Sequence, residues 1–176
     1  MSDTPSTRPP LIVVMGVTGS GKTTVGQALA DHLGIEYADA DAFHSEANVA
    51  KMASGHPLTD EDRAPWLESI GSWLTEHDAS GAVVGCSALR RRYRDVLRAA
   101  APRLVFVHLA GDSGVLTERV ALRPGHFMPA SLVTSQLETL EPLEPDEAGI
   151  VLDLTTPVDD LVRAVAAHLD PTGDLS

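Results

Sequence analysis

The sequence predicts a three-layer α/β domain, in which helices cover both faces of a five-stranded parallel sheet. Short apolar segments alternate with amphipathic helical segments along the chain, as in parallel strands joined by right-handed crossovers. The 176 residues are enough to bury one substantial core. No internal repeat or second domain interrupts the pattern. We therefore expect a single domain over 11–170, with a disordered tail at 1–10 and a second tail at 171–176.

Each element is assigned from its own apolar pattern. The first strand, Leu11–Met15, is wholly apolar, which is typical of a strand covered on both faces. A helix over 24–33 follows and ends at Gly34, a common helix stop. The other strands are expected at 35–38, 82–85, 104–109 and 150–154, and the other helices at 65–76, at 88–100 and after a capping signal at Thr156, with an apolar stripe that runs from Val158 to Leu169. Pro65 is expected in a first helical turn, where its missing N–H costs nothing.

The charge of the chain disfavours nucleic-acid binding, which usually needs a basic face, because the formal net charge is −12. The basic residues are nevertheless uneven, and five of the 13 are arginines between Arg90 and Arg98. This run predicts either a solvated helix face or an anion site. Lys22 and Lys51 are the only lysines, which makes each a candidate for a specific role.

The compartment is predicted from the N-terminus and the cysteine content. The apolar run at 11–15 is far too short to cross a bilayer, and residues 1–10 lack the pattern of a signal peptide. Cys86, the only cysteine, cannot form an internal disulfide, in keeping with a reducing compartment. We expect a cytoplasmic protein with no membrane partner. Cys86 is expected to be a small buried thiol without a catalytic role.

A complete phosphate-binding motif, GVTGSGKT at 16–23, follows the first strand and opens the first helix. Its glycines let successive N–H groups turn inward around a β-phosphate, and the helix N-terminus favours the same anion. Lys22 can reach the β- and γ-phosphates, and the Thr23 hydroxyl can hold Mg²⁺. The expected ATP-binding residues here are Gly16, Thr18, Gly19, Ser20, Gly21, Lys22, Thr23 and Thr24. The motif predicts a P-loop fold that binds ATP and Mg²⁺, and by itself it indicates only an NTPase.

Two carboxylates, Asp39 and Asp41, follow the second expected strand. Such a pair can be a solvated loop, but this one lies at the carboxyl edge of a parallel sheet, where ligands of open α/β folds bind. Phosphoryl transfer to a hydroxyl needs a carboxylate near that hydroxyl and support for the water shell of Mg²⁺. We assign Asp41 as the base that orients the hydroxyl and Asp39 as an outer-shell magnesium partner.

Several further strings cover most of the chain between residue 11 and about residue 165. They are DADAFH at 39–44, Asn48, KMASG at 51–55, PL at 57–58, Asp60, DR at 62–63, PWL at 65–67, CSALRR at 86–91, YRD at 93–95, GHFM at 125–128, SQ at 135–136, LE at 140–141 and DE at 146–147. Together they resemble the bacterial gluconokinases, P-loop small-metabolite kinases related to shikimate kinase. The chain departs from that family at Ala40 and Ser45, where Gly and Pro are common.

The resemblance implies ATP-dependent phosphorylation of D-gluconate to 6-phospho-D-gluconate, a step of carbohydrate acid catabolism, and it suggests a homodimer. Gluconate carries one carboxylate and several hydroxyls, so its site needs a cation and polar groups. The expected substrate contacts are Asp41, His44, Lys51, Arg63, Ser87, Arg91 and Gln136. Arg63, Arg90 and Arg91 remain alternatives for the carboxylate.

A helical lid is expected at about 119–138. Arg119 and Arg123 lie one helical turn apart, just before Pro124 and Gly125, which suits a flap that closes over ATP. By similarity to related kinases, Arg119 would stack on adenine. Arg123 would meet the transferring phosphates and share the catalytic role with Lys22 and Asp41.

Two other functions remain open at this point. Another small-metabolite kinase, such as a shikimate kinase, would have different acceptor-side residues and no CSALR string. A non-catalytic ATP-binding regulator would be favoured by loss of Lys22, Asp41 or the lid arginines, which are all present. The acidic residues between Glu141 and Glu147 are expected to form a solvated turn rather than a metal site, because prolines interrupt regular ligand geometry.

Overall fold

The fold is taken from a computed structural model that describes residues 8–56, 58–122 and 130–169, with the side chains of 130–132 left out. Five strands, β1 (Leu11–Met15), β2 (Glu36–Asp39), β3 (Ala82–Gly85), β4 (Val105–Ala110) and β5 (Gly149–Asp153), form one parallel sheet in the order β2-β3-β1-β4-β5. The helices are α1 (Lys22–Leu33), α2 (Glu46–Ala53), α3 (Asp60–Glu76), α4 (Arg91–Ala100), α5 (Ser113–Ala121), α6 (Ala130–Thr139), α7 (Val158–Leu169) and a short 3-10 helix, η1 (Ala40–Phe43).

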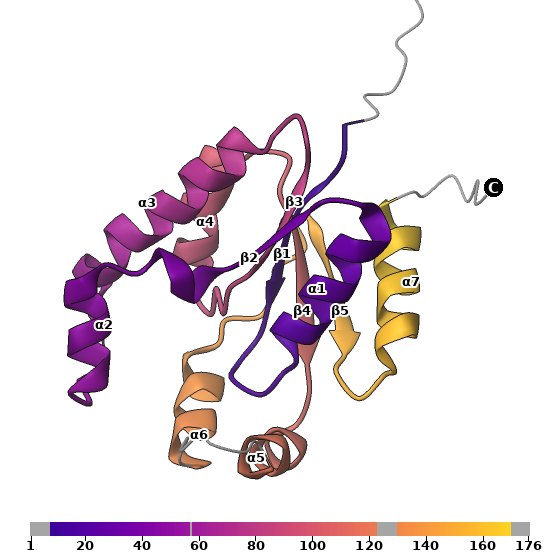
Figure 1. Cartoon of the computed structure of the whole chain (residues 1–176). Coiled ribbons are helices and arrows are strands. Elements are labelled where there is room, and N and C mark those ends of the chain that lie inside the picture. Colours follow the sequence, from indigo (N-terminus) through magenta and orange to yellow (C-terminus); the bar gives the residue numbers. More distant parts are fainter. Residues whose placement is uncertain (1–7, 57, 123–129, 170–176) are drawn as a thin grey trace, which may run out of the picture.

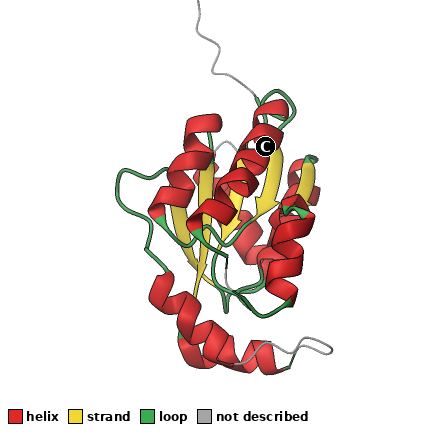
Figure 2. Cartoon of the chain, turned by 90° about the vertical axis from the view of Figure 1, so that its left-hand side faces the viewer, coloured by secondary structure: helices red, strands yellow, loops and turns green. Residues whose placement is uncertain are grey.

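The sheet is the middle of three layers, as the sequence predicts. Helices α3 and α4 cover one face and α1 and α7 cover the other, while α5 and α6 lie beyond the carboxyl ends of the strands (Figure 1). Figure 2 shows the strands side by side with helices around them. The side chains of β1 alternate between the two faces. Leu11 and Val13 join the core under α3 and α4, and Ile12 and Val14 join the core under α1 and α7.

The central position of β1 decides where a ligand can bind. β1 pairs with both β3 and β4, and all five of its residues have no exposed surface. The chain that leaves β1 therefore emerges between the two halves of the sheet, at the point where the strand order reverses. Ligands of open α/β folds bind at such switch points. Gly85 of β3 pairs with both Val14 and Asp39, so three strands end side by side.

Helix α3 begins earlier than the sequence pattern predicts. Thr59 and Asp62 form a capping box, in which the Thr59 hydroxyl accepts from the Asp62 N–H and the Asp62 carboxylate accepts from the Thr59 N–H. Acidic residues in the first turn also favour a start at Asp60. The placement of Pro65 in the first turn is therefore wrong, because Pro65 lies inside the helix.

Helix α2 is absent from the sequence-based assignment, although Ser45 marks its start by accepting from the Asn48 N–H at 3.1 Å. Strands β1 and β3 have the predicted bounds, and the ends of the other predicted elements, apart from α3, differ by at most three residues.

Residues 8–10 are held against the domain, which differs from the disordered tail expected over 1–10. Arg8 pairs with Asp78 at 2.7 Å, Arg103 donates to the Pro9 carbonyl, and the Ala82 N–H donates to the Pro10 carbonyl. The rest of that tail, and the tail expected at 171–176, lie outside the described residues. Among the described helices, none is long and apolar enough to span a membrane.

The arginine run and the acidic segment form one ion-pair network. The side chains of Arg94 and Glu147 are both fully buried, and two hydrogen bonds of 2.7 and 3.0 Å join them. Burial alone would raise the pKa of Glu147, but hydrogen bonds from Arg94 and Arg98 outweigh it, so this pKa is lowered. Arg91 pairs with Glu144 and Asp146 nearer the surface. The interpretations of a solvated helix face and of a solvated acidic turn are therefore wrong for the buried members of the network, because packing brings the two segments together.

Candidate active site

The loop between β1 and α1 has the backbone of a phosphate cradle. Gly19 and Gly21 have φ values of 81° and 96°, a left-handed conformation that glycine adopts without steric cost. A Cβ atom on Gly19 would lie 2.8 Å from the Val120 side chain of α5, so space also requires glycine there. Gly21 is the N-cap of α1, so the N-terminus of this helix opens directly onto the loop. This geometry suits an anion such as the phosphates of a nucleotide.

Lys22 folds back over the loop, with its ammonium group 3.0 Å from the carbonyl oxygens of Gly16 and Val17. Gln136 of α6 accepts a hydrogen bond of 2.6 Å from the Thr18 N–H. Ser20 is buried, and its hydroxyl has no hydrogen-bond partner among the described residues. The nucleotide-binding role of these loop residues stays a prediction, and the fold adds a contact between Gln136 and the loop.

The ends of β1, β2 and β3 bring the proposed acceptor carboxylates toward the P-loop. Asp39 caps η1 by accepting from the Asp41 N–H at 2.9 Å, which fixes the chain at the end of β2. The buried Cys86 thiol, just after β3, lies among these groups. Burial raises the pKa of Cys86 to about 12, Lys22 opposes this shift, and Asp41 and Asp39 add to it. Lys22 and both aspartates are therefore close enough to act on one buried atom.

The loop that leaves β3 is tied to the P-loop and to α4. The Gly16 N–H donates to the Ser87 carbonyl at 3.4 Å, so Ser87 contributes its backbone here. Ala88 has a φ of 44°, and such a left-handed non-glycine residue costs on the order of 1–3 kcal/mol. Its carbonyl accepts from the buried Arg94 at 2.9 Å. The ion-pair network thus supports a strained loop at the edge of the site.

His44 follows η1, which carries Asp41, and its side chain lies against α3. Its ring stacks on Trp66 with the centroids 4.4 Å apart, and the Trp66 indole N–H donates to the Ala40 carbonyl at 2.7 Å. Burial lowers the pKa of His44 and Arg63 lowers it further, while Asp41 opposes the shift. His44 is therefore mainly neutral at pH 7, and it lies within electrostatic reach of both Asp41 and Arg63.

Arg63 presents its guanidinium group beside α4. It donates to the Tyr93 hydroxyl at 3.2 Å, and its guanidinium carbon lies 5.4 Å from the centroid of the Tyr93 ring. Within the described part of the chain, Tyr93 is the only group that accepts a hydrogen bond from Arg63. Since a guanidinium has five N–H donors, most of those of Arg63 remain available to a substrate.

Arg91 is engaged very differently. It makes two hydrogen bonds to Asp146, of 2.7 and 2.6 Å, and pairs with Glu144 and Asp95 as well. The hydrogen bonds to Asp146 raise the pKa of Arg91 further above its ordinary value. Arg90 lies 3.9 Å from Glu141, a longer contact. The fold therefore commits Arg91 to internal carboxylates and leaves Arg63 with open donors.

Lys51 joins α2 to the start of α3. Its ammonium group lies 2.6 Å from the Asp62 carboxylate. This hydrogen bond, followed by those from Thr59, lowers the pKa of Asp62 to about 2. The Asn48 side chain adds a second link by donating to the Asp62 carbonyl at 2.9 Å. Lys51 thus holds α2 against the first turn of α3, the turn that also carries Arg63.

The nucleotide side continues at α5. Arg119 donates to the Leu154 carbonyl at 2.9 Å, and one of its nitrogens would lie 3.7 Å from a Cβ atom placed on Gly21. It therefore lies between the P-loop and the end of β5, as expected for a group that contacts a nucleotide base. A hollow of about 590 Å³ opens nearby, lined by Gly111, Asp112, Asp153 and Thr155 among others. Arg123, and the hinge that follows it, lie outside the described residues.

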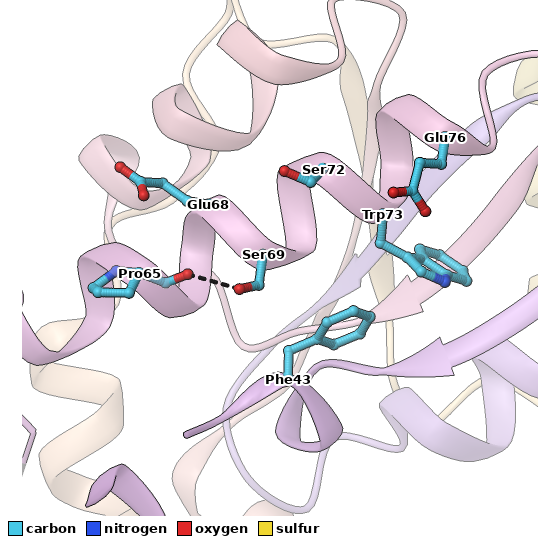
Figure 3. Close-up of a pocket in the computed structure, with 7 residues that line it drawn as sticks. All are labelled: Phe43, Pro65, Glu68, Ser69, Ser72, Trp73 and Glu76. Carbon is cyan, nitrogen blue, oxygen red and sulfur yellow. Dashed lines mark hydrogen bonds between the residues drawn. The ribbon is translucent and has the colours of Figure 1, made fainter. Parts of the chain in front are cut away.

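A second hollow, of about 570 Å³, lies on the outer face of α3 and is not lined by the P-loop. In Figure 3, the rings of Phe43 and Trp73 meet edge to face there, and the Ser69 hydroxyl donates to the Pro65 carbonyl at 2.9 Å.

Three aromatic residues of this region were not predicted from the sequence. Trp66 stacks on His44, Tyr93 contacts Arg63, and the ring of Tyr37 would clash at 2.5 Å with a Cβ on Gly26. Trp66 and Tyr93 fall inside strings that resemble a known family, which was the available signal. Their contacts depend on packing between separate helices.

A P-loop at the switch point of a parallel sheet, with two carboxylates after the end of another strand of that sheet, is typical of P-loop kinases of small molecules. The family model for shikimate kinase matches residues 18–166. The chain is 51% identical over 145 residues to a gluconokinase of Gluconobacter oxydans, covering 81% of this chain and 82% of that protein. It is 38% identical over 157 residues to the thermoresistant gluconokinase of Escherichia coli, covering 88% and 90% of the two chains.

Solved structures agree with these sequence matches. A gluconokinase from Sinorhizobium meliloti is 47% identical, with a TM-score of 0.84 over 94% of each chain. A shikimate kinase from Bacteroides thetaiotaomicron has a TM-score of 0.68 at 15% identity over 92% of this chain and 98% of that one, which shows a shared fold. The chain belongs to the gluconokinase family, whose members share the shikimate kinase type of domain.

Proposed function

We propose that this protein transfers the γ-phosphoryl group of ATP to D-gluconate and forms 6-phospho-D-gluconate. The observation that carries the proposal is that η1, which bears Asp41, leads directly into His44, whose ring stacks on Trp66 of α3, the helix that bears Arg63. Gly85 of β3 pairs with Val14, just before the P-loop, and with Asp39, just before η1, so the phosphate side and the acceptor side are neighbours. The relatives named gluconokinase support the same acceptor.

Asp41 is suited to the acceptor hydroxyl. The hydroxyl oxygen attacks the γ-phosphorus, ADP leaves, and the carboxylate of Asp41 takes the hydroxyl proton. Lys22, now bonded to two loop carbonyls, carries the charge that the phosphates require. The backbone N–H groups of the loop and the N-terminus of α1 add fixed dipoles aimed at the same phosphates.

The Thr23 hydroxyl would hold Mg²⁺, and Asp39 would hold a water molecule of its outer shell. Magnesium prefers oxygen ligands and keeps several waters, so one hydroxyl and one nearby carboxylate suit it when phosphates supply the rest. Asp39 lies at the end of β2, whose neighbour β3 pairs in turn with β1, the strand before the P-loop. Mg²⁺, when bound, neutralises phosphate charge.

Arg63 is the best candidate for the carboxylate of gluconate. A bidentate pair with a carboxylate needs two parallel N–H donors, and Arg63 has donors available while those of Arg91 are used by acidic residues. His44 and Trp66 form an ordered wall next to it for the hydroxylated carbon chain. We place the reaction in the cytoplasm, where ATP is available and the buried Cys86 thiol stays reduced.

A coupled assay of ADP release, with Mg²⁺-ATP and a panel of acceptors, tests the proposal. Gluconate should be turned over well, and shikimate, neutral sugars and nucleoside monophosphates poorly. Arg63→Ala should raise the KM for gluconate roughly 30-fold or more, because truncating one member of a charge pair costs about 2 kcal/mol or more. Arg163→Ala, on the exposed face of α7, is the matched control. Turnover of another acceptor in preference to gluconate would contradict the proposed substrate.

A further inference from the structure

We propose that Tyr93, backed by Asp60, is a positioning residue that aims the guanidinium of Arg63 at the carboxylate of the acceptor and so sets the preference for an acidic substrate. The inference rests on the proposed function, because it explains how Arg63 is held in position to bind the carboxylate of gluconate. Tyr93 lies on α4, while Asp60 and Arg63 lie on the first turn of α3. Packing of α3 against α4 brings the three together.

The hydrogen bonds have a fixed direction. The Tyr93 hydroxyl donates to the Asp60 carboxylate at 2.7 Å, because an ionised carboxylate can only accept. The lone pairs of the same oxygen then face a donor, and Arg63 supplies it at 3.2 Å. The hydrogen bond from Tyr93 is also the largest cause of the lowered pKa of Asp60, ahead of Arg92 and Arg63. Asp60 therefore stays ionised and continues to accept the hydrogen bond from Tyr93, which leaves the tyrosine oxygen to accept from Arg63.

The Tyr93 hydroxyl bridges Arg63 and Asp60, whose own ion pair is loose. Arg63 and Asp60 are 3.7 Å apart, beyond hydrogen-bond distance, and the second oxygen of Asp60 is taken by Arg92. Asp60 thus orients Arg63 through the tyrosine hydroxyl without occupying its N–H donors. Arg91 shows the opposite arrangement, in which carboxylates bond directly to the guanidinium and consume its donors.

The aromatic ring of Tyr93 makes a second contact with the guanidinium of Arg63. The carbon at its centre lies 5.4 Å from the ring centroid, within the range of a cation–π contact. Tyr93 itself is only 8% exposed and belongs to the core under α3 and α4, so it cannot follow the motion of a surface arginine. A charged side chain held at two points before the substrate arrives binds it with less loss of conformational freedom.

Tyr93→Phe tests the inference because it keeps the ring and removes only the hydroxyl. Without the hydroxyl, Asp60 can pair directly with Arg63 and draw it away from the acceptor. We expect the KM for gluconate to rise roughly tenfold, about the worth of one hydrogen bond to a charged group, with kcat changed less than about twofold and the KM for ATP unchanged. Val165→Ala, in the core on the other face of the sheet, controls for lost stability and should leave the KM for gluconate unchanged.

A double-mutant cycle separates positioning from a merely structural role. If Tyr93 acts through Arg63, then Tyr93→Phe should have no further effect on the KM for gluconate in the Arg63→Ala background. Equal effects in both backgrounds, or an unchanged KM in Tyr93→Phe, would overturn the inference while leaving the proposed function intact. Failure of the wild-type protein to use gluconate would instead overturn the proposed function, and a fall in kcat alone would assign Tyr93 to stability.

Discussion

Replacing Glu147 with alanine should destabilise the domain more than any change to a surface charge. Glu147 is the only carboxylate among the described residues that pairs with the fully buried Arg94, and it also pairs with Arg98. An arginine cannot release its proton in a protein, so Arg94 would stay charged in a site without water. Carbonyl oxygens of Ala88 and Pro142 would remain as its acceptors, but neither carries a balancing charge.

The size of the loss in stability follows from the buried charge of Arg94, which the substitution leaves without a carboxylate partner. Removing one partner of a buried ion pair costs about 3–5 kcal/mol, because the other charge stays buried and uncompensated. For a domain of this size that is a fall in Tm of roughly 10 °C. A fall in pH should also lower the free energy of unfolding. The pKa of Glu147 is lowered in the folded protein, so its contribution is present above the unfolded value of 4.5 and is lost as pH falls through the folded value.

Urea unfolding at pH 7, followed by circular dichroism, measures the effect. Glu144→Ala is the matched control, because Glu144 lies three residues away in the same network but is about half exposed, and its loss should cost about 1 kcal/mol or less. A fall of less than 1 kcal/mol in Glu147→Ala, or equal falls in the two variants, would refute the view that the buried pair carries the network.

Three further predictions concern the site and the core. Asp41→Asn should lower kcat about 10²- to 10⁴-fold with little change in fold, as expected for loss of a general base, and near-normal turnover would remove that role. Gln136→Ala should raise the KM for ATP about fivefold, because it removes a hydrogen bond that ties the P-loop to α6, and a larger effect on the KM for gluconate would instead assign Gln136 to the gluconate site. Burial, aided by Arg94, lowers the pKa of His108, so the folded protein binds a proton there less readily than the unfolded chain. Stability should therefore fall by up to about 1 kcal/mol relative to His108→Leu as pH drops from 7.5 to 5.5, and parallel unfolding curves for the two proteins would contradict this.

The order of the sheet elements and the P-loop could be read from the sequence because both depend on local patterns. Alternating apolar segments show which residues must be buried, and the spacing of Gly16, Gly21 and Lys22 fixes a phosphate cradle within eight consecutive residues. The start of α3 was misplaced for a local reason too. Pro65 is a strong signal for a first helical turn, yet the capping box at Thr59 outweighed it.

The sequence alone therefore determined the fold class, the nucleotide loop and the family resemblance. The tertiary structure decided which arginine has its donors used by internal carboxylates. Arg63 and Arg91 have the same chemistry, and their difference lies in partners 30 to 55 residues away, Tyr93 for the first and Glu144 and Asp146 for the second. Charges act through space rather than along the chain, so only the packing of α3, α4 and the segment after α6 shows which guanidinium is already neutralised and which remains open to substrate.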